Sequence, residues 1–205
     1  MGSNRFLRNN VYLLSFLLLA PGFCIAQKFT IEDIPLTWNN FTRKSKYTAG
    51  SHTAAICYSI LKDYERKIVN DTSVYYIRLN LMLRRSCSYV REEFMQTALP
   101  GEKELLLNHE KGHLIIVLVQ LKQMQNALSV FPFTILYKKE ADSICMHFAE
   151  KIKSMGTDYD NNTHHGTAGM RQLIWETTAM LYFNELYADD TVIKFETIIP
   201  LSISY

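Results

Sequence analysis

The chain has 205 residues, of which 48% are hydrophobic and 20% are charged, a balance typical of one globular domain. It excludes the disordered, collagen-like and low-complexity classes, because such chains cannot bury enough apolar surface. The formal net charge is +2, and Arg5 and Arg8 account for both charges, since residues 1–26 contain no acid. The rest of the chain is neutral and lacks the basic character of nucleic-acid-binding proteins, so we expect no nucleic-acid partner.

Residues 1–26 have the three zones of a secretory signal peptide. A basic start precedes the apolar run of residues 11–20, and a Pro-Gly turn leads to small residues just before Gln27. The apolar run is too short to span a bilayer comfortably. We therefore predict cleavage before Gln27, an exported protein (periplasmic or secreted) and no stable membrane span after cleavage. The alternative is an uncleaved N-terminal anchor.

The first half of the remaining chain has the pattern of β-strands. Residues 54–60 mix small and apolar side chains, and residues 73–83 alternate so that their apolar side chains share one face. Asn70 and Asp71 between them are turn-forming residues. The sequence therefore predicts a hairpin within residues 54–83.

The second half has the pattern of α-helices. Residues 102–128 predict a long helix that is apolar on most of its circumference and therefore buried. Further helices are predicted over residues 137–154 and 170–186, with a polar loop at 156–166 between them. Strands first and helices later predict an α+β fold, and we treat residues 27–205 as a single domain.

Three cysteines remain after the predicted cleavage: Cys57, Cys87 and Cys145. An odd number allows at most one intrachain disulfide. Cys57 and Cys87 flank the predicted hairpin and could form it. The alternative is that all three are small buried hydrophobic residues.

The sequence HEKGH at residues 109–113 lies within the predicted buried helix. Residues four apart are separated by about 40° of rotation and about 6 Å of rise, so His109 and His113 can bind one zinc ion together. Glu110 can then reach a metal-bound water and take its proton as the catalytic base. The alternative is a pair of hydrogen-bonded core histidines with a surface glutamate. Lys111 is unusual here, because zinc proteases usually carry an uncharged residue between the ligands.

A catalytic zinc site needs a third protein ligand and an open position for water. We favour His165, which lies in the predicted polar loop beside Gly166, where the backbone can turn sharply. His164 is the next candidate, followed by the glutamates of the later helices, Glu140, Glu150 and Glu176.

The same loop contains two further candidate site residues. Asp160 can orient a ligand histidine, and Tyr159 can donate a hydrogen bond to the developing oxyanion as a catalytic residue. The alternative for residues 159–162 is a plain turn in which side chains hydrogen-bond to the local backbone.

Three blocks of the sequence resemble the bacterial family of unknown-function domains described as predicted secreted zinc-dependent proteases. They are LTWNNF at residues 36–41, HEKGH at residues 109–113, and a block that matches at Tyr159, Asp160, Thr163, His165 and Gly166, followed by Gln172 and Trp175. The resemblance implies a zincin-like fold in which N-terminal antiparallel strands pack on a buried active-site helix accompanied by two further helices. It also implies that His109, Glu110 and His113 are the active-site residues. The choice of His165 as third ligand is our inference from the matching block.

The function predicted from these features is that of a secreted zinc metallopeptidase acting on a peptide or protein substrate. Zincins bind the substrate backbone along an edge strand beside the active-site helix, and residues 73–83 are our candidate for this strand. For these residues the alternative is an interior strand with no exposed edge. The alternative is a non-catalytic metal-binding or envelope-scaffold module of the same fold. Lys111 and the short chain favour this alternative.

Overall fold

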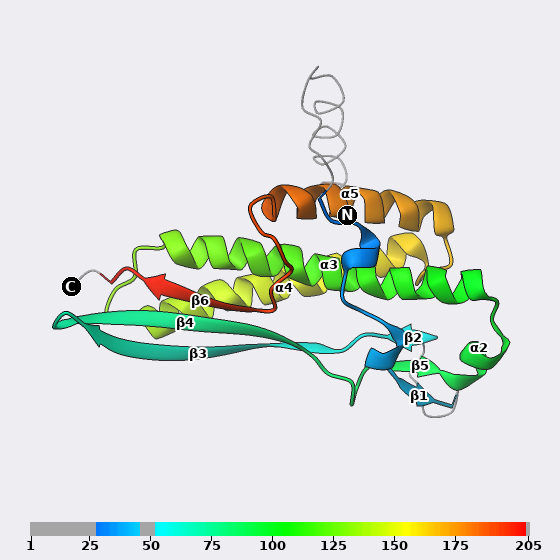
Figure 1. The fold of residues 1–205 in the computed structure, drawn as a ribbon, viewed down its shortest axis with the longest axis horizontal. Coiled ribbons are helices and arrows are strands. Elements are labelled where there is room, and N and C mark those ends of the chain that lie inside the picture. Colours follow the sequence, from blue (N-terminus) through cyan, green and yellow to red (C-terminus); the bar gives the residue numbers. More distant parts are fainter. Residues whose placement is uncertain (1–27, 46–51, 204–205) are drawn as a thin grey trace, which may run out of the picture.

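The computed structural model describes residues 28–45 and 52–203, so the predicted signal peptide lies outside the described residues. Over these residues the fold is mixed α+β, as predicted, with two three-stranded sheets and three long helices (Figure 1). Two short 3-10 helices, η1 (Ile31–Asp33) and η2 (Trp38–Asn40), precede the first strand. In the described part of the chain, no helix has the length and apolar character needed to cross a bilayer.

The larger sheet contains the predicted hairpin. Strands β3 (Tyr58–Val69) and β4 (Thr72–Leu83) pair antiparallel in full register, and Asn70 and Asp71 both have positive φ, as a tight hairpin turn requires. Strand β6 (Glu196–Leu201) pairs antiparallel with the other side of β4. The prediction that residues 73–83 form an edge strand is therefore wrong, because β4 is the central strand and β3 is an outer one.

The smaller sheet lies beside the N-terminal half of α3 and has the order β1-β5-β2 (Figure 1). Strand β5 (Tyr89–Arg91) pairs parallel with β1 (Thr42–Lys44) and antiparallel with β2 (Ala54–Ala55), which is an outer strand. A disulfide joins Cys57, just after β2, to Cys87, just before β5, while Cys145 has a free thiol. Of the two alternatives for the cysteines, the disulfide between Cys57 and Cys87 is therefore the one that the structure shows.

Helix α3 (Pro100–Val130) forms the centre of the molecule. It follows the short α2 (Glu92–Thr97) and packs against α4 (Tyr137–Thr163), α5 (Gly169–Leu186) and β6 (Figure 1). Leu114, Leu118 and Leu121 are fully buried in a core shared with the inner face of β4. The prediction of a long, buried helix is therefore confirmed.

Helix α4 is longer than predicted, and the prediction of a polar loop starting at residue 156 is wrong. The helix continues to Thr163 because Tyr159 and Thr163 are buried one turn apart, while Asn161 between them is exposed to solvent. The true loop begins at His164, where three successive residues with positive φ, ending at Gly166, stop the helix. Tyr159 and Asp160 are consequently held on a helix.

Candidate metal centre

His109 and His113 lie one turn apart on α3 and direct their Nε2 atoms at the same atom of α4. The Oδ1 atom of Asp160 is 3.1 Å from Nε2 of His109 and 3.0 Å from Nε2 of His113. The three ligand atoms all lie within 4.8 Å of one another, so this group could hold a metal ion. The spacing of the two histidines in the sequence predicted that they act together, and α4 supplies the third donor, Asp160.

Asp160, rather than His165, completes this group. Nδ1 of His165 lies 3.4 Å from Oδ1 of Asp160, and the His165 side chain is half exposed at the rim of the site. His164 lines the cavity beside this group but does not join it, and its Nε2 lies 3.3 Å from the Arg171 guanidinium. Among the described residues, no glutamate belongs to the group, and Glu140 instead accepts hydrogen bonds from Thr134. The expected order of third-ligand candidates is therefore corrected in favour of Asp160.

The charges of the three groups are strongly coupled. Burial alone would raise the pKa of Asp160, but its hydrogen bonds to both histidines outweigh burial and hold this pKa well below its usual range. Burial lowers the pKa of His109, while for His113 the hydrogen bond to Asp160 and the charge of Glu110 outweigh burial and raise the pKa. The carboxylate is thus ionised at neutral pH and available to a cation.

The geometry of the donors fits a small divalent metal ion. Two imidazole nitrogens and one carboxylate oxygen are ligands that transition metals accept. Tetrahedral coordination with bonds of about 2.0–2.1 Å separates neighbouring ligand atoms by about 3.3 Å. The two distances from Asp160 to the histidines are shorter than this by a few tenths of an ångström, and all three donor atoms lie within 4.8 Å of one another, so the side chains would have to rearrange to bind such an ion.

Thr163 sets the orientation of the His109 ring. Its hydroxyl donates to the backbone oxygen of Tyr159 (2.8 Å) and lies 3.4 Å from Nδ1 of His109. If a metal ion took the place of the Nε2–H···Oδ1 hydrogen bond to Asp160, the ring proton would lie on Nδ1, and the Thr163 oxygen, whose own proton is already donated, could accept it. Thr163 belongs to the sequence block that ends at Gly166, but the sequence alone gave it no role.

Glu110 is the buried acid beside the cluster, with 2% of its surface exposed. The backbone N–H of Ile56, directly after β2, donates to its Oε2 (2.8 Å). Burial raises the pKa of Glu110 to about 7. This carboxyl group can therefore gain or lose a proton near neutral pH, and it is not the surface glutamate of the alternative interpretation.

A cavity of about 470 Å³ opens beside these groups. Helix α3 contributes His109, Glu110 and His113 to it, and α4 contributes Asp160. The strand β2 forms the opposite wall, and the rings of His52 and His165 lie 4.4 Å apart at the lining. A reactant in this cavity would contact both the candidate metal ligands and Glu110.

Tyr159 does not line this cavity in the structure, although the sequence suggested a catalytic role for it. Its ring is 1% exposed and stacks on the imidazole of His109, with centroids 4.7 Å apart. Its hydroxyl lies over Gly112, where an added Cβ would come within 2.6 Å of Cζ of Tyr159. In the structure the Tyr159 ring therefore packs against His109, and Gly112 is required by the close approach of the two helices, while the donation to an oxyanion stays a prediction.

Lys111 is buried but takes no part in the cavity. Its ammonium group donates to the backbone oxygen of Ile31 (2.9 Å) in the N-terminal segment. The charge between the two histidines therefore anchors that segment to α3. This contact gives Lys111, which is unusual at this position of the HEKGH sequence, a structural role.

Comparisons with known proteins found no match to a family model, a curated protein or a solved structure. The resemblance to the secreted zinc-dependent protease family therefore stays a prediction based on the three sequence blocks.

Proposed function

We propose that the protein is an exported zinc metallopeptidase with a zincin-like fold. The observation that carries this proposal is the convergence of His109, His113 and Asp160 on one point, beside a buried glutamate and an open cavity. Three protein donors would leave the fourth position of a tetrahedral zinc ion free for water, as in catalytic zinc sites. When bound, zinc would lower the pKa of a coordinated water and polarise the substrate carbonyl.

The residues of the chain would carry the proton transfers. Glu110 accepts a proton from the attacking water and donates it to the leaving nitrogen, for which a pKa near the working pH is suited. The N–H of Ile56 orients the carboxylate during both steps. His109 is held in place by Tyr159 and Thr163.

The short strand β2 would bind the substrate backbone in place of the strand expected from the sequence. It is an outer strand of the smaller sheet, and Ala54 and Ala55 line the cavity. Within the described residues β2 pairs only with β5, so an extended peptide could pair with its other edge by strand addition, close to Glu110.

The proposal is tested by Glu110→Gln. We expect zinc content to stay unchanged, while cleavage of fluorescein-labelled casein falls by about 10²–10⁴-fold because the proton acceptor is lost. Glu104→Gln, at an exposed position of the same helix, is the matched control and should keep full activity. Full activity of Glu110→Gln would overturn the assigned role.

Zinc binding by the wild-type protein without any cleavage would instead favour the non-catalytic metal-binding module. The orientation of Lys111 weakens this alternative, because its charge does not enter the cavity. Metal analysis and the casein assay on the same sample therefore separate the two functions.

A further inference from the structure

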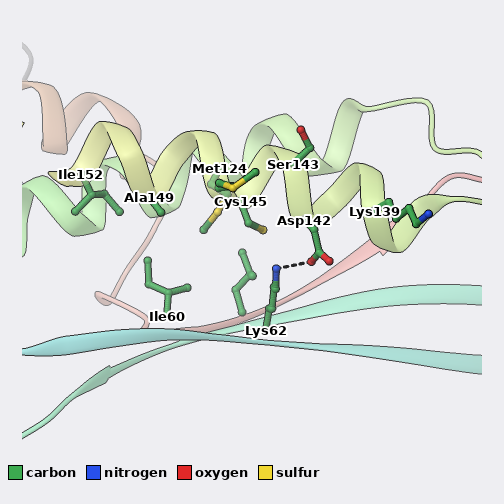
Figure 2. A pocket seen from close by; sticks show the side chains of 11 residues that line it. Ile60, Lys62, Met124, Lys139, Asp142, Ser143, Cys145, Ala149 and Ile152 are labelled. Carbon is green, nitrogen blue, oxygen red and sulfur yellow. Dashed lines mark hydrogen bonds and ion pairs between the residues drawn. The ribbon is translucent and has the colours of Figure 1, made fainter. Parts of the chain in front are cut away.

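A second cavity of about 480 Å³ lies between α4 and the larger sheet (Figure 2). Its base is apolar and includes the buried side chains of Leu79, Met124 and Ile152. Ala149 and Met146 line its α4 side and are exposed, Met146 to 62%. The cavity is therefore an open groove rather than an enclosed pocket.

This groove continues the cavity of the metal centre. Ile152 lines both cavities, and on α4 the lining residues follow one another at helical spacing from Asp160 through Gly156, Ile152 and Ala149 to Asp142. On the strand side, Tyr58 lines the first cavity, and Ile60 and Lys62 line the second. Alternate residues of β3 share one face, so the strand forms a continuous wall as well.

We propose that this groove, which we call the α4–β3 groove, binds the substrate polypeptide on one side of the cleaved bond. The inference rests on the proposed function, because it takes the metal centre as the place of cleavage. Asp142 precedes Asp160 by eighteen positions, which is about 27 Å along a helix. This length accommodates about eight residues of extended chain.

The chemistry of the groove indicates which polypeptides it binds. Its apolar base contacts apolar side chains, and methionines such as Met124 and Met146 adapt to different shapes. The far end is marked by the ion pair of Lys62 with Asp142 (Figure 2). Asp142 also accepts a hydrogen bond from the Tyr64 hydroxyl (2.8 Å). The substrate class is thus an unfolded or extended polypeptide with apolar residues near the cleaved bond.

The substitution Ala149→Trp tests the groove, because it places a large side chain at an exposed lining position. The background is zinc-loaded Glu110→Gln protein, so that the probe, fluorescein-labelled casein, is bound without being cleaved. We expect fluorescence anisotropy to show at least tenfold weaker binding for Ala149→Trp. Ser154→Trp, at an exposed position of α4 that lines neither cavity, is the matched control and should bind casein normally. Equal binding by the two variants, or no binding by the background protein, would overturn the proposal.

Cys145 gives a second measurement that needs no large substitution. Its thiol is half-buried in the groove, so bound casein should slow its alkylation by N-ethylmaleimide, measured by mass spectrometry of the Cys145 peptide. Unchanged alkylation at saturating casein would contradict the proposal.

The two proposals can fail separately. Casein that binds and protects Cys145 but is not cut by the wild-type protein would refute the peptidase and leave the groove as a binding site. Casein that is cut equally fast by wild type and by Ala149→Trp, with Glu110 intact, would refute the groove alone.

Discussion

Two neighbouring stretches of helix α3 are both buried but have opposite composition. Residues 109–113 include the buried polar side chains of His109, Glu110 and Lys111, whereas residues 114–121 are apolar except for Gln120. Burying polar groups is costly unless they find partners. Each of the three finds one in a different part of the chain, namely Asp160, the Ile56 N–H and the Ile31 carbonyl.

The difference distinguishes the part of the helix that packs the core from the part that could bind a metal ion. The apolar stretch gains its stability from packing, where the loss of atoms leaves a cavity. The polar stretch depends on specific atoms brought together from three distant segments. Substitutions should therefore separate into those that reduce stability and those that reduce metal binding.

The largest expected effect is that of Asp160→Asn. The amide has the shape of the carboxylate but not its charge, so we expect the variant to keep its fold. We expect its zinc affinity to fall by on the order of 100-fold or more, which exceeds the loss usually caused by removing a group that only orients a ligand. Competition with a chromophoric chelator measures the affinity. Asp158→Asn, exposed on the same helix, should bind zinc normally.

The contrasting control lies in the apolar stretch. Leu121→Ala should lower the free energy of unfolding by about 2–5 kcal/mol in urea, yet keep its zinc affinity at temperatures where it is folded. If Leu121→Ala lost zinc while folded, or Asp160→Asn bound it like wild type, the separation of the two stretches would be wrong.

The sequence predicted the parts of the fold that depend on local patterns. Alternation and the Asn70–Asp71 turn were sufficient for the hairpin, and continuous apolar character was sufficient for α3. Strand β6 was not predicted, because it is defined by pairing with β4, more than a hundred residues earlier in the chain.

The third donor of the metal centre could not be predicted for a related reason. The polar run around Asp160 has the composition of a loop, and its helical state depends on the burial of Tyr159 and Thr163 against α3. Only the helix directs Asp160 at His109 and His113 and leaves His165 at the rim. A helical reading of residues 156–163 would have placed Asp160, Gly156 and Thr163 on one face.

A smaller effect is expected for Gly112→Ala, which alters the polar stretch without removing a ligand. The added Cβ would come within 2.6 Å of the Tyr159 ring, so the ring must move away from α3. We expect a loss of about 1–3 kcal/mol in the free energy of unfolding, together with weaker zinc binding, because Tyr159 stacks on His109.

Gly101→Ala is the matched control on the same helix. Nothing lies within 4 Å of a Cβ at this position, so the substitution should be neutral or stabilising by up to about 1 kcal/mol. Equal stability of the two variants in urea would show that Tyr159 is not tightly held against Gly112.

The smallest effect is expected for Tyr159→Phe, which also decides between a packing and a catalytic role for this residue. Burial raises the pKa of the phenol above its usual value, so the hydroxyl is neutral, and it has no hydrogen-bond partner within residues 28–45 and 52–203. Because an unpaired buried hydroxyl destabilises a protein, its removal should leave stability unchanged or raise it by about 1 kcal/mol. The phenylalanine ring would keep the stacking on His109, so zinc affinity should stay within about twofold of wild type.

The rate of casein cleavage distinguishes the packing role of Tyr159 from the catalytic one. A hydroxyl that stabilised an oxyanion would contribute about 10²–10³-fold to turnover. We expect Tyr159→Phe to retain its turnover, since the hydroxyl lies over Gly112 and the ring lies outside the cavity lining. A loss of 100-fold with unchanged zinc content would mean that the ring moves into the cavity when substrate binds. Tyr159 would then belong with Glu110 among the residues that act on the substrate.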